Sequence, residues 1–220
     1  HTLALHDALP ISAGSGTVWC GRGRQRCRST SNGRPTRALK QRNSLLKNLA
    51  GRGGRIDEFA ESTLEVWDEQ VARIGSELLH ARLDTLTDLM PYVSEAYESI
   101  APTNNIARAE YKTSLDLVPG LTEEPGRDLL ERRLRDAMLA RRREETARGV
   151  SLVGPHRDDL NLFLGELPAK GYASHGECWS LALALRLGGF QLLRADGIEP
   201  VLVLDDVFAE LDSTRRLRLA

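Results

Sequence analysis

The sequence predicts an α/β protein in which a region of short strands and one buried helix follows a helical arm subdomain. Amphipathic helical patterns occupy much of residues 59–148. At Gly149 the composition changes, and short runs with strand-like alternation are then separated by turns that contain glycine. Near the end of the chain the apolar run VLVL leads directly into two aspartates, Asp205 and Asp206. These three observations define the predicted order of elements.

Size and composition exclude few classes of protein. The 220 residues suffice for one large or two small domains, and 41% hydrophobic residues is ordinary for a globular protein. No apolar run approaches the roughly 18 residues of a membrane span, so we expect no membrane association. Cys20, Cys27 and Cys178 form no C-x-x-C pair, which argues against a zinc site or a disulfide framework and fits the reducing cytoplasm.

Basic residues are concentrated near the N-terminus. Residues 17–55 contain eleven Lys and Arg and no acid, a pattern typical of a nucleic-acid-binding arm. However, HTLALHDALPIS resembles a translated sequencing adapter, and CGRGRQRCRSTSNGRP resembles coding sequence read out of frame. We therefore expect residues 1–36 to be an artefact or a disordered segment, with the true protein beginning near Arg37.

The first helical pattern begins at Phe59. Apolar residues recur there at alternating spacings of three and four, and Pro91 is expected to kink or break the helix and Pro102 to end it. The apolar seam consists of Leu64, Trp67, Val71, Ile74, Leu78 and Ala81. The charged residues expected on the other faces are Glu65, Asp68, Glu69, Arg73 and Glu77.

A second helix is expected over residues 127–148, with Gly149 as its C-terminal stop. Its sequence RRLRDAMLARRREE is strongly basic; a solvated face is the preferred interpretation and a DNA contact the alternative. Residues 106–118 are predicted to be strand-like. The residues expected to face inward on the helix are Leu130, Leu134, Ala137 and Met138.

Beyond Gly149 the pattern predicts short strands and then a buried helix. Leu160, Leu162 and Leu164 alternate as in a half-buried strand. The segment CWSLALALRLGGFQLLRA is apolar almost all round, which predicts a helix packed against the sheet. The segment DGIEP closes this helix and leads into the predicted VLVL strand.

The paired aspartates at the end of the VLVL run need an explanation, because burial of an unpaired carboxylate is costly. Asp205 and Asp206 could simply begin a surface turn. Alternatively they mark a nucleotide site, since acidic residues at the C-terminal end of a strand hold Mg²⁺ in many ATPases built on parallel sheets. The residues alone leave both interpretations open.

The turn YASHGE precedes the predicted buried helix. Ser174 and Gly176 would lie where the helix begins, and a helix N-terminus attracts anions such as phosphate. Taken alone, Ser174 could be only an N-cap. An S-x-G-E turn that opens a helix, followed roughly thirty residues later by a strand ending in DD and then ELD, is the order of the signature, Walker B and D-loop motifs in ABC-type ATPase heads.

Three segments, LVGPHRDDL, PAKGYASHGECWSLALALRLG and EPVLVLDDVFAELDSTRR, resemble the RecF family in its actinobacterial form. RALKQRNSLLKN and LEVWDEQVARIGSELLHAR resemble the helical arm of that family. The resemblance implies an α/β ABC/SMC-type ATPase head, with residues 37–149 as a helical arm subdomain and residues 150–220 as a partial head. No G-x-x-x-x-G-K-[ST] motif is present, so the P-loop half of the head is missing and we expect a fragment without ATPase activity.

The resemblance also implies roles for individual residues. Asp205 would hold Mg²⁺, and Asp206 would polarise the attacking water, slowly because most ABC relatives have Glu there. The signature residues Ser174, Gly176 and Glu177 would contact the γ-phosphate of ATP bound by the other subunit of a dimer, and Asp212 would lie in the D-loop at the dimer seam. His156 and Arg157, in GPHRDDL, are interpreted as a structural turn.

For the full-length parent, the resemblance implies a weak ATPase that acts as an ATP-dependent homodimer in the cytoplasm. Such a protein binds DNA at gaps and at single-strand to double-strand junctions, and helps RecA to load with its partners RecO and RecR. It would serve DNA replication, recombination, repair and the SOS response. The alternatives are another SMC-like or ABC-type ATPase, such as a transporter subunit, and a non-enzymatic helical interaction module built on residues 59–148.

Overall fold

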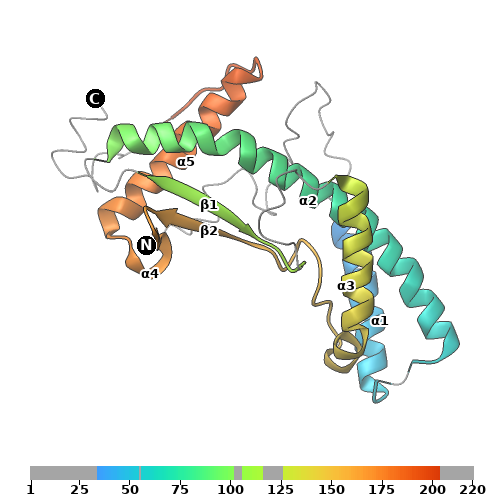
Figure 1. Ribbon diagram of the computed structural model, residues 1–220. Coiled ribbons are helices and arrows are strands. Elements are labelled where there is room, and N and C mark those ends of the chain that lie inside the picture. The colour runs from blue at the N-terminus through green and yellow to red at the C-terminus, as the bar shows by residue number, and fades with distance from the viewer. Residues whose placement is uncertain (1–33, 55, 102–105, 116–125, 204–220) are drawn as a thin grey trace. The chain divides into compact units, whose positions relative to one another are not determined.

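The computed structural model describes residues 34–54, 56–101, 106–115 and 126–203. These residues fall into two compact units. The sheet unit contains residues 84–111 and 160–203, and the arm unit contains residues 34–83 and 112–159. The domain boundary expected at residue 149 was drawn from composition and stays a prediction. The helices are α1 (Arg34–Gly51), α2 (Glu58–Ile100), α3 (Arg127–Arg148), α4 (Ala169–Tyr172) and α5 (His175–Ala195), and the strands are β1 (Ala107–Lys112), β2 (Asp159–Leu164) and β3 (Leu167–Pro168) (Figure 1).

The sheet unit is built on a three-stranded sheet in the order β1-β2-β3. Strands β2 and β3 are antiparallel, with Leu164 opposite Leu167, and Gly165 in the short turn between them has a positive φ of 59°. The strand predicted in residues 106–118 is confirmed for residues 107–112, which form β1; residues 113–115 are not a strand, and residues 116–118 lie outside the described part. The alternation in β2 is confirmed too, because Leu162 and Leu164 are buried.

The core of the sheet unit joins the C-terminal part of α2, the sheet and α5. The expected buried helix is confirmed for the first half of α5, where Leu181 and Leu185 are each 1% exposed. Its last turn, by contrast, is largely exposed, and the helix ends at Ala195 as the DGIEP segment predicted. The buried members of this core are Leu89, Val93, Tyr97, Ala101, Ala107, Leu162, Leu164, Ala169, Leu181, Ala184 and Leu185.

Pro91, which was expected to kink or break the helix, does not break α2. The helix continues through Pro91 to Ile100. Proline removes one helical hydrogen bond, but Pro91 itself is exposed, while Leu89 and Val93 on either side are fully buried in the core. Burial of these neighbours compensates for the lost hydrogen bond.

The α2 helix is not long and apolar enough to cross a membrane, and this holds for every helix among the described residues.

The strand expected in the VLVL run is not present in its described part. Residues 201–203 have no regular secondary structure, and Val201 and Val203 are 89% and 80% exposed. A β-strand needs a neighbouring strand to satisfy its backbone hydrogen bonds, and the three-stranded sheet of the described residues does not extend to this segment. The prediction was therefore wrong for these residues, and Leu204 lies outside the described part.

The arm unit consists of α1, the first part of α2, and α3. The predicted bounds of α3 are confirmed, and Gly149 ends the helix in the left-handed region with its N–H donating to the carbonyl of Glu145. Leu130, Leu134 and Met138 of α3 are fully buried, as expected.

A network of charged side chains lies inside the arm unit. Arg42 of α1 is 1% exposed, and its guanidinium donates to Asp68 of α2 and Glu145 of α3, each at 2.6 Å. Arg142 of α3 donates to the second oxygen of Asp68 at 2.7 Å. Asp68 is only 5% exposed, so its expected place on the outer face of the helix was wrong. The helix turns this carboxylate inward because two guanidinium groups neutralise it there.

The ion pairs also determine the protonation of Arg42. Burial alone would lower the pKa of its guanidinium. The hydrogen bond to Glu145 and the charges of Asp68 and Glu145 outweigh burial and raise the pKa above its ordinary value. Arg42 therefore stays charged within the buried network.

We expect Arg42→Met to lower the free energy of unfolding by about 3–5 kcal/mol, because it leaves two buried carboxylates without their shared partner. Lys40→Met on the same helix is the matched control; Lys40 is exposed, and a change within about 0.5 kcal/mol is expected there. Urea unfolding followed by circular dichroism measures both. A loss for Arg42→Met no larger than that of the control would show that the network does not hold the arm unit together.

Helices α2 and α5 cross closely at Gly188. A Cβ at this position would lie 2.6 Å from Cγ2 of Val93 and 3.0 Å from its backbone nitrogen. The neighbouring Gly189 has no such contact within 4 Å. The two adjacent glycines therefore differ in what a methyl group would meet.

We predict that Gly188→Ala destabilises the protein by about 1–3 kcal/mol through overpacking. Gly189→Ala should instead stabilise it by up to about 1 kcal/mol, because alanine is the better helix former. Thermal or urea unfolding distinguishes the two. The close crossing would be refuted if both alanine variants gained stability.

Candidate functional site

The structure describes three of the six predicted site residues. Ser174, Gly176 and Glu177 lie at the start of α5, in the sheet unit. Asp205, Asp206 and Asp212 lie in residues 204–220, outside the described residues. The site can therefore be built from the turn that opens α5.

Ser174 is the N-cap of α5, and the turn forms a capping box. The hydroxyl oxygen of Ser174 accepts from the backbone N–H of Glu177 at 3.3 Å. In return, the Glu177 carboxylate accepts from the backbone N–H of Ser174 at 2.8 Å and from its hydroxyl at 2.7 Å. The simpler interpretation of Ser174 as a cap is thus confirmed, and its role towards a nucleotide stays a prediction.

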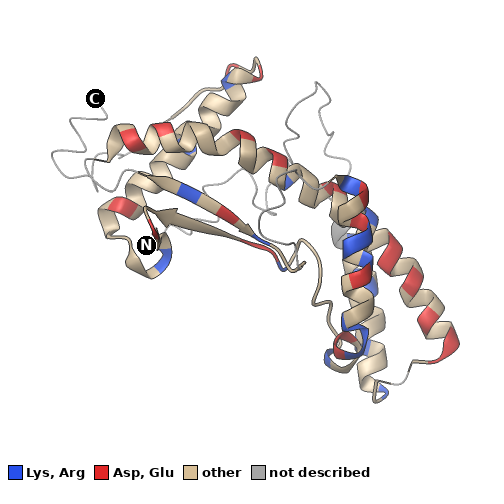
Figure 2. Ribbon diagram, viewed as in Figure 1, with Lys and Arg blue, Asp and Glu red and all other residues tan. Residues whose placement is uncertain are grey.

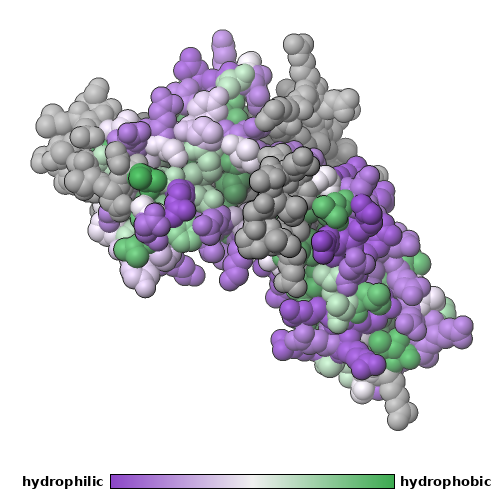
Figure 3. Space-filling model, viewed as in Figure 1, coloured by the Kyte–Doolittle hydropathy of each residue, from purple (hydrophilic) through white to green (hydrophobic). Residues whose placement is uncertain are grey.

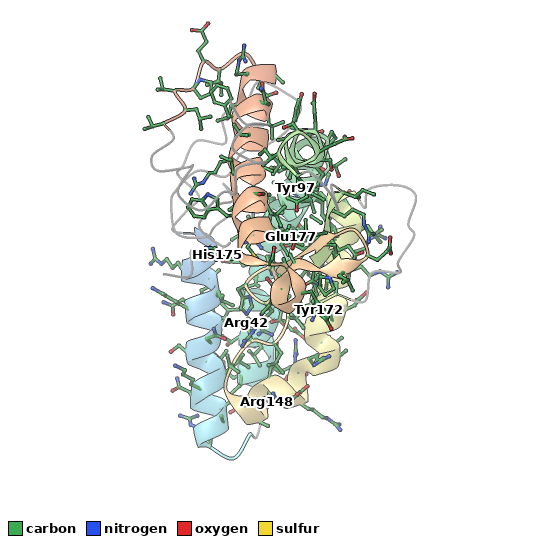
Figure 4. The ribbon with its side chains drawn as sticks, turned by 90° about the vertical axis from the view of Figure 1, so that its left-hand side faces the viewer. Arg42, Tyr97, Arg148, Tyr172, His175 and Glu177 are labelled. Atoms are coloured by element: carbon green, nitrogen blue, oxygen red, sulfur yellow. The ribbon has the colours of Figure 1, made fainter. Side chains whose placement is uncertain are left out.

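The turn lies on an exposed part of the sheet unit. Tyr172 at the end of α4 is 67% exposed, and Ser174 and His175 are exposed as well. Figure 4 shows the labelled Tyr172, His175 and Glu177 around this end of α5. Because α5 has 21 residues, its aligned peptide dipoles give this end a partial positive charge, which favours an anion there. A phosphate could approach Ser174 and Gly176 from solvent.

Other chemistry is not supported around this turn. Burial raises the pKa of the Cys178 thiol, and the charge of Glu177 raises it further, so the thiol stays protonated near neutral pH and is a poor nucleophile. Among the described residues, no cluster of three or more His, Cys, Asp or Glu side chains could hold a metal ion. At this turn the partial positive charge of the helix end favours an anion, and the Glu177 carboxylate that accepts from Ser174 opposes one.

The segment GPHRDD forms a turn in the arm unit, as interpreted from the sequence. The N–H of Arg157 donates to the carbonyl of Gly154 at 2.9 Å, and the Arg157 guanidinium donates twice to the carbonyl of Ser151. Partial burial lowers the pKa of His156, and the charges of Arg157 and Arg42 act in the same direction. His156 is therefore largely neutral at pH 7.

The buried network holds Ser151 and Leu152, the residues that lead into this turn. Arg42 donates to the hydroxyl of Ser151 at 2.6 Å, and Glu145 accepts from the backbone N–H of Leu152 at 2.6 Å. Asn43 accepts from both the N–H and the hydroxyl of Ser151. Sequence reasoning missed these positioning residues. The spacing of apolar residues indicates which side of a single helix is buried. It does not reveal hydrogen bonds between residues 103 or 109 positions apart, such as those of Arg42 with Glu145 and Ser151.

Comparisons with known proteins agree with the predicted resemblance. No family model matches the chain. It is 58% identical over 193 residues to the "DNA replication and repair protein RecF" of Cutibacterium acnes. This match covers 84% of this chain and 49% of the relative. It is 56% identical over 187 residues to the protein of the same name from Streptomyces avermitilis, and this match covers 84% of this chain and 48% of that relative. The chain thus spans about half the length of the curated relatives it matches.

Two solved structures of the recombination mediator protein RecF in the RecFOR pathway are also similar. The structure named with ATPrS has a TM-score of 0.69 at 29% identity, covering 83% of this chain and 47% of that one. The structure named with ATP has a TM-score of 0.70 at 28% identity, covering 84% and 47%. These matches confirm the predicted fold class, a partial α/β ATPase head of the ABC/SMC type with a helical arm. By sequence and by structure, the chain belongs to the RecF family.

Proposed function

We propose that the whole protein is an ATP-dependent DNA-binding protein of replication and repair. In this proposal it acts in the cytoplasm at DNA gaps and at single-strand to double-strand junctions, and helps RecA to load with RecO and RecR. The names of the relatives and of the solved structures support DNA repair, the RecFOR pathway and ATP.

The observation that carries the proposal is the exposed, capped turn at the start of α5. Leu181 and Leu185 bury the following turns of the helix in the core, so the position of Ser174 is held by the sheet unit. The positive end of a firmly held helix can stabilise a γ-phosphate. In this proposal Ser174, Gly176 and Glu177 meet the ATP bound by a second subunit, and ATP therefore links two copies into a homodimer.

The three aspartates of residues 204–220 complete the proposed site. Asp205 would hold Mg²⁺, for which a carboxylate oxygen is a suitable ligand, and a bound Mg²⁺ would neutralise charge on the phosphates. Asp206 would polarise the attacking water, and Asp212 would lie at the seam between subunits. This assignment would answer why two adjacent carboxylates follow an apolar run: the metal and its nucleotide would neutralise them.

The chain as given should release no phosphate from ATP, because it has no G-x-x-x-x-G-K-[ST] segment to hold the β- and γ-phosphates. A phosphate-release assay on the purified chain tests this, with Asp205→Ala as the control for contaminating activity. Steady release that Asp205→Ala abolishes would contradict the expectation. In a full-length RecF that carries these residues, Asp205→Asn should weaken Mg²⁺-dependent ATP hydrolysis.

The role of Ser174 can be tested by three substitutions in a full-length RecF that carries these residues. Ser174→Ala removes the cap, at a cost of about 1 kcal/mol, but adds neither charge nor bulk. Ser174→Asp keeps an oxygen that can accept from the N–H of Glu177, but it loses the hydrogen bond to the Glu177 carboxylate and repels a phosphate, and Ser174→Arg puts a bulky cation where the phosphate must approach. If Ser174 faces the nucleotide, Asp and Arg should abolish ATP-dependent dimerisation while monomers still bind ATP.

Sedimentation with and without ATP and Mg²⁺ measures dimerisation, and thermal unfolding measures the stability that is lost when the cap is removed. A protein in which Ser174 is only a cap gives a different result: Ser174→Ala and Ser174→Arg lose the same cap and are equally damaging to stability, and neither affects dimerisation beyond that loss. Dimerisation of the Ser174→Arg protein at the parental level would show that the turn does not meet the nucleotide of a second subunit.

A further inference from the structure

The arm unit carries exposed basic residues that the buried network does not use. Helix α1 contains no acidic residue, and α3 contacts α1 along its side. Six exposed bases on these two helices have no ion pair with any residue that the structure describes. We call them the basic face: Arg37, Lys40 and Lys47 of α1, and Arg132, Arg133 and Arg143 of α3.

Exposed acidic residues of the arm unit lie on α2 and, as Asp128 and Asp136, on α3, but none lies on α1. Figure 2 shows acids along the first part of α2 and mostly bases on α1 and α3. The two acids that α2 and α3 turn towards α1, Asp68 and Glu145, are buried and already paired with Arg42 and Arg142. They therefore do not neutralise the exposed bases. The exposed acids of this part of α2 are Glu58, Glu61, Glu65, Glu69 and Glu77.

A solvated helix face explains only part of this pattern. On α3, Arg135, Arg141 and Arg148 pair with Glu131 or Glu144 three or four residues away, as is usual for exposed helices. Helix α1 has no acid with which to form such pairs. On α1 this segregation of charge creates a positive potential that attracts a polyanion, whereas on α3 the exposed Asp128 and Asp136 each lie four residues from Arg132. The view in Figure 3 also shows a mainly hydrophilic surface over the arm unit.

The kind of nucleic acid follows from the residue types that these helices do not contain. Helices α1 and α3 contain no Phe, Trp, Tyr or His, so these two helices offer no aromatic ring of their own on which an unpaired base could stack; the exposed Phe59 of the arm unit belongs to α2. Lysine and arginine side chains alone bind phosphates without reading the bases. Lys40 and Lys47 are two helical turns apart, about 10 Å along the axis, a length over which one strand of duplex carries about three phosphates.

We propose that the basic face binds the phosphate backbone of the double-stranded arm of the DNA junction. This assignment rests on the proposed function, because it specifies which part of the DNA the arm unit holds. Binding there is independent of sequence and sensitive to salt, and the unpaired strand is held elsewhere in the protein.

The test compares two triple variants in a full-length RecF that carries residues 37–220 of this chain. The first changes Lys40, Lys47 and Arg143 to Glu. The matched control changes three exposed bases of the sheet unit, Lys170, Arg186 and Arg194, to Glu. Fluorescence anisotropy with ATP and Mg²⁺ measures the affinity for a blunt duplex and for a single strand of equal length over a salt series. A second version of each triple variant carries Gln instead of Glu, which removes the positive charges without adding negative ones. Circular dichroism shows whether each variant is folded.

The basic-face variant should bind the duplex at least about tenfold more weakly, and the slope of log affinity against log salt should fall by about 0.9 for each phosphate that the protein no longer neutralises. Its affinity for the single strand and both affinities of the control should change much less. Unchanged duplex binding would overturn the assignment, as would an equal loss of affinity for both probes. A parent protein that binds neither probe would instead refute the proposed DNA binding itself.

Discussion

The arm unit depends on the guanidinium of Arg42. It lies at the meeting point of α1, α2 and α3, and it joins Asp68, Glu145 and Ser151 by hydrogen bonds of 2.6 Å. A planar group with five N–H donors in fixed directions can reach three acceptors from three segments at once, whereas the three donors of a lysine all leave one nitrogen atom. Removal of these charges from water is costly, and a well-packed apolar cluster could give equal stability. What the network supplies is geometry, because the helices and the segment after α3 must take the positions that satisfy it.

The same network shapes the surface of the arm unit. Arg42 and Arg142 bind Asp68 and Glu145 inside, so these two acids do not neutralise the bases left outside on α1, a helix that has no acid of its own. The carboxylate of Glu145 also receives the N–H of Leu152, which determines where the chain leaves α3 and enters the GPHRDD turn. The buried charges thus connect the packing of the helices, the position of the turn and the charge pattern outside.

Local signals allowed much of the fold to be predicted from sequence. Helix α3 ends at Gly149 and the capping box opens α5 because both depend on residues a few positions apart. Features that depend on distant partners were missed. Asp68 was expected on a solvated face because its partner Arg142 is 74 positions away, and Pro91 was expected to interrupt a helix that the core keeps continuous. The exposed Val201 and Val203 show the same limit, since an apolar run becomes a strand only beside another strand.

A cap and a phosphate-binding turn are compatible roles for Ser174, because different forces hold the turn in place. The capping box organises the first turn of α5, but Leu181, Ala184 and Leu185 fix the helix itself against the sheet. Loss of the hydroxyl therefore costs stability without moving the positive end of the helix. Loss of the space in front of the helix, or a negative charge placed there, affects an approaching phosphate without removing the cap. The packing of α5 is therefore what makes the two roles of Ser174 separable.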